Sequence, residues 1–222
     1  MSMPLSSTIS QRSDVLQVNR VLRNTYWLLS LTLLFSAITA GVSSALSLPH
    51  PGLLLTLVGY FGLLFLTTRY RNSSLGLVMV FALTGFMGYT LGPLLNMYLA
   101  MSNGPQLVMT ALAGTAVTFL TLSAYALISR RDFSFMGSFL LTGIIVGFLA
   151  GLGAYLFSVP GLALAVSAIF VLLMSGLILY ETSNIIHGGE TNYIMATVTL
   201  YVAIYNLFTS LLHLFTAFDN QG

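Results

Sequence analysis

The basic residues of this chain alternate with long apolar stretches, and this alternation restricts the fold more than any other feature. Three of the seven precede the first apolar stretch, two follow the second and two follow the fourth. The loops after the first, third and fifth stretches contain none. Because short loops rich in Lys and Arg stay on the cytoplasmic side of a membrane, the pattern predicts a multi-pass membrane protein with a cytoplasmic N-terminus. The seven residues are Arg12, Arg20, Arg23, Arg69, Arg71, Arg130 and Arg131.

The composition supports lipid as the main surrounding of the chain. Charged residues make up 5% of the sequence and hydrophobic residues 57%, whereas a soluble domain has about 25% charged residues. The formal net charge of +2 comes from the predicted cytoplasmic segments, so it does not indicate nucleic-acid binding. The chain has no cysteine, which excludes thiolate catalysis and cysteine-ligated metals.

Seven apolar stretches have the length of transmembrane helices, for which about 20 residues are needed. They predict an all-α integral membrane domain over residues 24–218, with the short C-terminus, 219–222, on the outer side. In the alternative, the last stretch lies at the membrane interface or re-enters the membrane, which leaves six spans and both termini inside. The stretches cover residues 24–47, 52–68, 75–99, 105–129, 134–158, 161–187 and 193–217.

The N-terminal segment before the first stretch has a different composition. Residues 1–20 are polar, rich in Ser and Gln, and have no apolar periodicity. Such a segment cannot bury enough apolar surface to fold by itself. We therefore expect a flexible cytoplasmic tail over residues 1–23.

Glycines recur at helical spacing in two of the predicted spans. The first set recurs every four residues in the fifth span, and the second set lies on one face of the third. Small residues at this spacing let helix backbones approach closely in lipid. This predicts compact packing within one bundle, with a dimer interface as the alternative. The two sets are Gly143, Gly147 and Gly151, and Gly85, Gly88 and Gly92.

Small and polar residues also follow one face of the seventh span. They are spaced by 4, 3, 4 and 3 residues, which places them on one side of a helix. This stripe predicts a helix packed at the centre of the bundle, where polar groups bond to other helices. The residues are Thr199, Ala203, Asn206, Ser210 and His213.

Ionisable residues near the spans are the places where chemistry is expected, since a charge in hydrocarbon is costly unless it is paired. Glu181 lies in the sixth span, roughly 8 Å from its inner end at 1.5 Å per residue, and Asn184 shares its face. Two interpretations stay open: a proton-sensitive gate or cation ligand, and a structural carboxyl group. His187 and Glu190 flank a glycine pair in the next inner loop, but no third metal ligand accompanies them.

Known catalytic motifs are missing from the sequence. It has no phosphate-binding glycine loop, no Gly-x-Ser-x-Gly elbow and no His-Glu-x-x-His motif, which are the marks of common hydrolases and nucleotide-binding enzymes. The spans also lack a pair of aspartates suited to proteolysis within the membrane. We therefore expect neither an enzyme nor a bound cofactor.

Several segments resemble one family of membrane proteins. The most specific is residues 181–194, Glu-Thr-Ser-Asn-Ile-Ile-His-Gly-Gly-Glu-Thr-Asn-Tyr-Ile, which is followed by Leu200-Tyr201 and Asn206-Leu207-Phe208. This run is similar to the signature of the Bax inhibitor-1 family. The first span and residues 91–96 and 130–135 are similar to its bacterial YccA branch.

The resemblance implies a fold and two activities. The implied fold is a seven-helix bundle whose last helix is surrounded by the other six. Members of the YccA branch are implied to bind and restrain FtsH, the ATP-dependent protease of the bacterial inner membrane. Other members are implied to be pH-sensitive calcium leak channels, in which an acid on helix six pairs with an aspartate on helix seven and with an arginine at the inner end of helix two.

The residues of the implied gate are only partly present. Glu181 matches the acid of helix six, whereas the position of the helix-seven aspartate is Ala203. Arg69 and Arg71 lie near the arginine position. Calcium prefers six to eight oxygen ligands, so the site is poor in ligands for it. We therefore expect an inner-membrane protein that modulates FtsH, acting as a slow competing substrate through its tail, with a calcium or other cation leak as the alternative. The candidate polar site comprises Glu181, Asn184, Asn206, Arg69 and Arg71.

Overall fold

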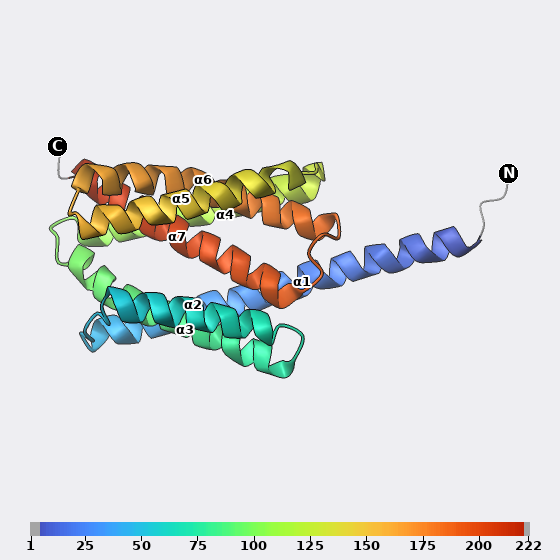
Figure 1. The fold of residues 1–222 in the computed structure, drawn as a ribbon, viewed down its shortest axis with the longest axis horizontal. Helices are drawn as coiled ribbons and strands as arrows, with labels where there is room; N and C mark the ends of the chain where they lie inside the picture. The colour runs from blue at the N-terminus through green and yellow to red at the C-terminus, as the bar shows by residue number, and fades with distance from the viewer. Residues whose placement is uncertain (1–4, 220–222) are drawn as a thin grey trace.

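A computed structural model describes the chain from residue 5 to residue 219, with side chains from residue 16 onward. The described residues form seven α-helices in the order expected from the apolar stretches (Figure 1). A short 3-10 turn (Ser134–Met136) precedes the fifth helix. Residues 220–222 of the predicted outer C-terminus lie outside the described part, as do residues 1–4. The helices are α1 (Leu5–Ala45), α2 (Leu53–Arg69), α3 (Ser74–Leu99), α4 (Gly104–Ser129), α5 (Gly137–Leu156), α6 (Pro160–Ile186) and α7 (Tyr193–Asp219).

The lengths of these helices match a bilayer. Six of them are long and apolar enough to cross a membrane, and α2 is a shorter apolar helix of 17 residues. At 1.5 Å per residue α2 spans about 26 Å, close to the roughly 30 Å of the hydrocarbon core. The seventh helix runs the length of the bundle (Figure 1), which does not fit a helix lying at the interface. The prediction of a multi-pass, all-α membrane bundle is confirmed.

Helix α7 lies between two groups of three helices. It packs against α1 and α3 on one side and against α4 and α6 on the other (Figure 1). The two outer helices extend these groups, α2 against α3 and α5 against α6. The central position predicted for the last helix is confirmed, and its main contacts are with these four helices.

Hydrogen bonds from α7 to its neighbours are made chiefly by side chains outside the predicted stripe. The hydroxyl group of Tyr201, which is 1% exposed, lies 2.6 Å from Ser36 Oγ of α1 and also donates to the Thr84 carbonyl oxygen of α3. Within the stripe, His213 Nδ1 lies 2.8 Å from Ser167 Oγ of α6. Asn206 instead donates to the Val202 carbonyl oxygen of its own helix.

The first helix begins earlier than the sequence indicated. Its backbone is helical from residue 5, and the Val21 side chain is 7% exposed and packs with Ile185 and Ala196. The structured bundle therefore extends into the predicted flexible segment 1–23 at least as far as Val21. A physical reason is that extending an existing helix costs far less than nucleating one, so polar residues next to a stable span continue its helix.

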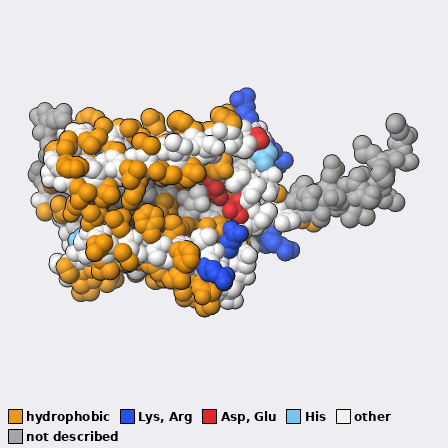
Figure 2. Space-filling view, viewed as in Figure 1, with side chains coloured by type: hydrophobic (Ala, Val, Ile, Leu, Met, Phe, Trp, Pro, Cys, Tyr) orange, Lys and Arg blue, Asp and Glu red, His pale blue; other side chains and the backbone are white. Residues whose placement is uncertain are grey.

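The described arginines lie at one end of the bundle, which we call the arginine end. It is formed by residues 20–23 of α1 and by the loops at residues 70–73, 130–133 and 187–192. Figure 2 shows the Lys and Arg side chains gathered there, with hydrophobic side chains over much of the remaining visible face. Hydrogen bonds between these loops, described below, hold the end together.

Candidate functional site

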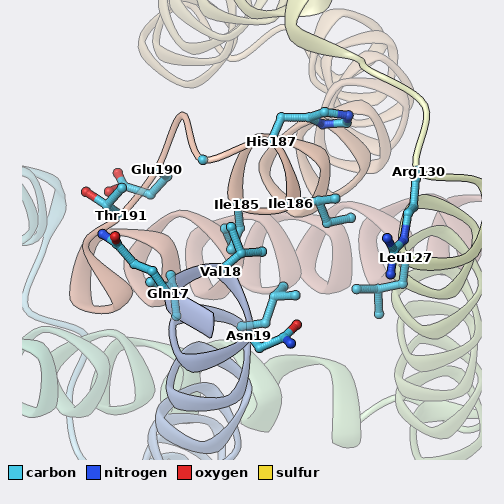
Figure 3. Close-up of a pocket in the computed structure, with 13 residues that line it drawn as sticks. Gln17, Val18, Asn19, Leu127, Arg130, Ile185, Ile186, His187, Glu190 and Thr191 are labelled. Atoms are coloured by element: carbon cyan, nitrogen blue, oxygen red, sulfur yellow. The ribbon is translucent and has the colours of Figure 1, made fainter. Parts of the chain in front are cut away.

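A pocket of about 480 Å³ opens at the arginine end. It lies between α1, the end of α4 and the loop that joins α6 to α7. Glu190 and Gln17 lie on one side of it and Leu127 and Arg130 on the other, with Ile185 between them (Figure 3). One wall is therefore polar and acidic, the opposite wall carries a cation, and the base is apolar.

Ser183 holds the loop after α4 against the end of α6. Its side chain is 1% exposed and donates to the Arg131 carbonyl oxygen at 3.0 Å while accepting from the Phe133 amide at 3.0 Å. In the same loop the Ser134 amide donates to Asp132 Oδ1 at 2.8 Å, and this bond holds the pKa of the Asp132 carboxyl group below its usual range. One buried hydroxyl group thus fixes a loop that carries two arginines.

Asn192 joins the other two loops of the arginine end. Its Oδ1 accepts from the Ile194 and Met195 amides, which caps the first turn of α7 in the usual manner of Asn at this position. Its Nδ2 donates to the Arg71 carbonyl oxygen at 3.0 Å and to Asn72 Oδ1 at 2.8 Å. One residue therefore begins the central helix and binds the loop between α2 and α3.

Glu181 lies inside the bundle, 4% exposed. Asn184, one turn further along α6, faces the same carboxyl group. Among residues 16–219, however, Glu181 Oε1 has no hydrogen-bond partner. Glu181 and Asn184 lie together on α6, as predicted. Neither Arg69 nor Arg71 reaches Glu181 Oε1.

The remaining predicted residues lie apart from Glu181. Arg69 and Arg71 are exposed at the arginine end, where Arg71 takes part through its backbone. Asn206 bonds within α7. Ala203, at the position where the resemblance implies an aspartate, is 0% exposed and packs in an apolar cluster with Ile178.

The two inner-loop residues have separate surroundings. His187 Nδ1 lies 2.9 Å from the Ser183 carbonyl oxygen, and Glu190 Oε1 accepts from the Asn192 amide at 2.6 Å. Within the described part of the chain, no group of three His, Asp or Glu side chains is placed to hold a metal ion. Both residues thus act in ordering the loop that lines the pocket.

Neither Ser183 nor Asn192 is among the site residues predicted from the sequence, although together they connect all the loops of the arginine end. Asn192 had a usable signal, because Asn directly before an apolar helical run is a common N-cap. For Ser183 there was no such signal. A serine near a helix end shows its role only when its partners, here the Arg131 and Phe133 backbones, are known.

Comparisons with known proteins agree with the fold and the signature. Residues 18–220 match the family Bax1-I, described as inhibitor of apoptosis-promoting Bax1. A relative from Escherichia coli strain K12, named modulator of FtsH protease YccA, is 55% identical over 206 residues, which cover 93% of this chain and 94% of the relative.

Two further relatives come from other bacteria. An uncharacterized protein of Pseudomonas aeruginosa is 54% identical over 211 residues, covering 95% of this chain and 94% of the relative. An uncharacterized protein of Neisseria meningitidis is 33% identical over 215 residues, covering 91% of this chain and 93% of the relative. With a bundle of seven helices in which α7 is central, and a family match over nearly its whole length, the chain belongs to the Bax inhibitor-1 family.

Proposed function

We propose that this chain binds the membrane protease FtsH and restrains it. The observation that carries the proposal is the 55% identity, over 93% of the chain, to a relative named modulator of FtsH protease. Because the similarity covers nearly the whole chain, the surface that a shared partner contacts is expected to be similar. The role proposed is that of a regulator, without catalysis of its own.

We place the protein in the bacterial inner membrane with the arginine end in the cytoplasm. The gathering of arginines at one end (Figure 2) supports this orientation, because basic loops stay inside. An Escherichia coli relative, 55% identical over 206 residues, is named an inner membrane protein. In this orientation the pocket, the loops tied by Ser183 and Asn192, and the start of α1 all face the cytoplasm.

The proposed mechanism is competition for the protease. Helix α1 has 41 residues, about 60 Å at 1.5 Å per residue, which is twice the hydrocarbon thickness of roughly 30 Å. Its N-terminal part extends beyond the arginine end (Figure 1), where a cytoplasmic protease could engage it. The remainder of α1 is packed against α3, α6 and α7, so we expect extraction of the chain to be slow and the protease to stay occupied.

The test is to delete residues 2–12 and measure how fast FtsH degrades a second membrane substrate. The intact chain is expected to slow this degradation, and the truncated chain to slow it much less. The matched control replaces residues 2–12 with a Gly/Ser segment of the same length. This variant is expected to slow the degradation as the intact chain does. Equal degradation of the substrate with intact and truncated chains contradicts the competition mechanism.

For the candidate polar site we infer a structural role. Glu181 faces Asn184 of its own helix, and Ala203, where the resemblance implies a second acid, packs in an apolar cluster with Ile178. The single acid of α7, Asp219, accepts from Asn103 at the opposite end of the bundle. Calcium flux into dye-loaded liposomes is therefore expected to be negligible, and equal for the wild type and Glu181→Gln at mildly acidic and mildly alkaline pH. A flux that the substitution abolishes contradicts this inference.

A further inference from the structure

Three buried side-chain oxygens have no hydrogen-bond partner among residues 16–219. They come from three different helices: Thr25 of α1 is 0% exposed, and Ser123 of α4 and Glu181 of α6 are each 4% exposed. A buried polar group without a partner is costly, and nearly all such groups in native proteins are satisfied by protein or by ordered water. The three atoms are Thr25 Oγ1, Ser123 Oγ and Glu181 Oε1.

All three residues lie one helical turn below the pocket at the arginine end. Each is separated by four residues from a residue of the same helix that lines the pocket. Four residues correspond to about 6 Å along a helix. Because α1 runs away from the arginine end while α4 and α6 run toward it, each step leads deeper into the bundle. The pairs of lining residue and deeper residue are Val21 and Thr25, Leu127 and Ser123, and Ile185 and Glu181.

Contacts of Tyr26 bring the three helices together at this depth. Its hydroxyl group lies 3.5 Å from Thr182 Oγ1 of α6, and its ring centroid lies 6.2 Å from that of Phe119 of α4. Tyr26 and Thr182 are the chain neighbours of two of the unpartnered residues, and Phe119 is one turn from the third. Residues next to Thr25, Ser123 and Glu181 along their helices are therefore in contact with one another, at the same depth below the pocket.

We propose that ordered water is bound in this region, hydrogen-bonded to Thr25, Ser123 and Glu181 and continuous with the pocket above. Hydroxyl groups both donate and accept, and a carboxyl oxygen accepts, so the set suits a water molecule, which typically makes about three hydrogen bonds to buried polar groups. A calcium ion prefers six to eight oxygen ligands, more than this set supplies. The bound water connects the Glu181 carboxyl group with solvent at the arginine end.

The test compares two substitutions that remove a hydroxyl group with little change of shape, Thr25→Val and Ser123→Ala, in the full chain in lipid nanodiscs. If water is bound, each substitution removes one of its partners, and the unfolding temperature Tm falls. The double variant then loses less than the sum of the two single losses, because both residues share the same water. If the region is dry, each substitution removes an unpaired polar group, and Tm stays unchanged or rises.

A matched control on α1 is Thr32→Val. Thr32 is 0% exposed, and its hydroxyl group donates to the Leu29 carbonyl oxygen at 3.0 Å, so its loss lowers Tm whether or not water is bound elsewhere. An experimental structure that resolves water is expected to place it within hydrogen-bond distance of at least two of the three oxygens. Unchanged or raised Tm in both variants, or a metal ion in place of the water, overturns the proposal.

Discussion

Two helices of this protein carry similar rows of glycines, yet the rows pack in different ways. On α3, Gly88 faces the backbone carbonyl group of Ser36 on α1, and Gly92 faces Ser43 and the Ser44 amide of the same helix. A Cβ atom at Gly92 would lie 2.8 Å from that backbone nitrogen. These two glycines therefore bring the backbones of α1 and α3 together.

The glycines of α5 face side chains of α6 instead. Gly143 receives the end of Leu173 and Gly147 the ring of Phe170. Gly151 has only Val166 in ordinary contact, at 3.5 Å from an added Cβ atom. Side chains can turn aside, whereas a helix backbone cannot move without shifting the whole helix. Gly88 and Gly92 thus make a rigid contact with α1, whereas Gly85 of the same row faces the Phe35 ring, and the α5 glycines make an adaptable contact with α6. The rigid contact holds the helix proposed to be engaged by the protease.

The largest effect is expected from Gly88→Ala. The added methyl group meets the α1 backbone, so we expect a loss of about 3 kcal/mol in the free energy of unfolding, at the upper end for overpacked cores. Unfolding in lipid nanodiscs measures it. The control is Gly41→Ala on α1, where nothing lies within 4 Å of an added Cβ atom and stability is expected to be retained. If the two variants are equally stable, α1 and α3 are not in rigid contact.

A smaller loss is expected from Gly147→Ala. Its Cβ atom would lie 2.8 Å from Phe170 Cε2, and the ring can rotate away, so we expect a loss of about 1 kcal/mol, at the lower end for added methyl groups. The same unfolding measurement applies. A loss as large as that of Gly88→Ala removes the distinction between the two glycine rows.

The smallest effect is expected from Gly151→Ala. Because its nearest neighbour is at an ordinary contact distance, the gain from replacing glycine inside a helix, about 0.5 to 1 kcal/mol, is expected to balance or exceed any packing cost. Unchanged or slightly raised stability is the predicted result. A clear destabilisation indicates that α5 and α6 pack more tightly than the side-chain contacts suggest.

Much of the fold could be predicted from the sequence because lipid imposes a simple rule on it. The lengths of the apolar stretches predicted the helices, and the spacing of the arginines predicted that they lie at one end of the bundle. The small and polar face of the last span predicted its central position. The glycine rows predicted packing within one bundle, which their contacts confirm. Each of these features depends on spacing along a single helix.

Features that depend on which helices meet could not be predicted in the same way. The sequence did not indicate that Gly88 meets the α1 backbone, while Gly147 meets a ring. The resemblance put Arg69 and Arg71 near the position of an arginine that pairs with the acid of helix six, and neither reaches the unpartnered oxygen of Glu181. The helical extension of α1 to Val21 and beyond was missed because it depends on packing with α6 and α7.

The most direct test of this account is the degradation of a second membrane substrate by FtsH in liposomes that contain this chain, with Gly88→Ala and Gly151→Ala in parallel. We expect the wild type and Gly151→Ala to slow the degradation alike. Gly88→Ala is expected to slow it less and to be degraded faster itself, because its α1 is held less firmly. A substrate degraded at the same rate with and without the wild-type chain contradicts the account.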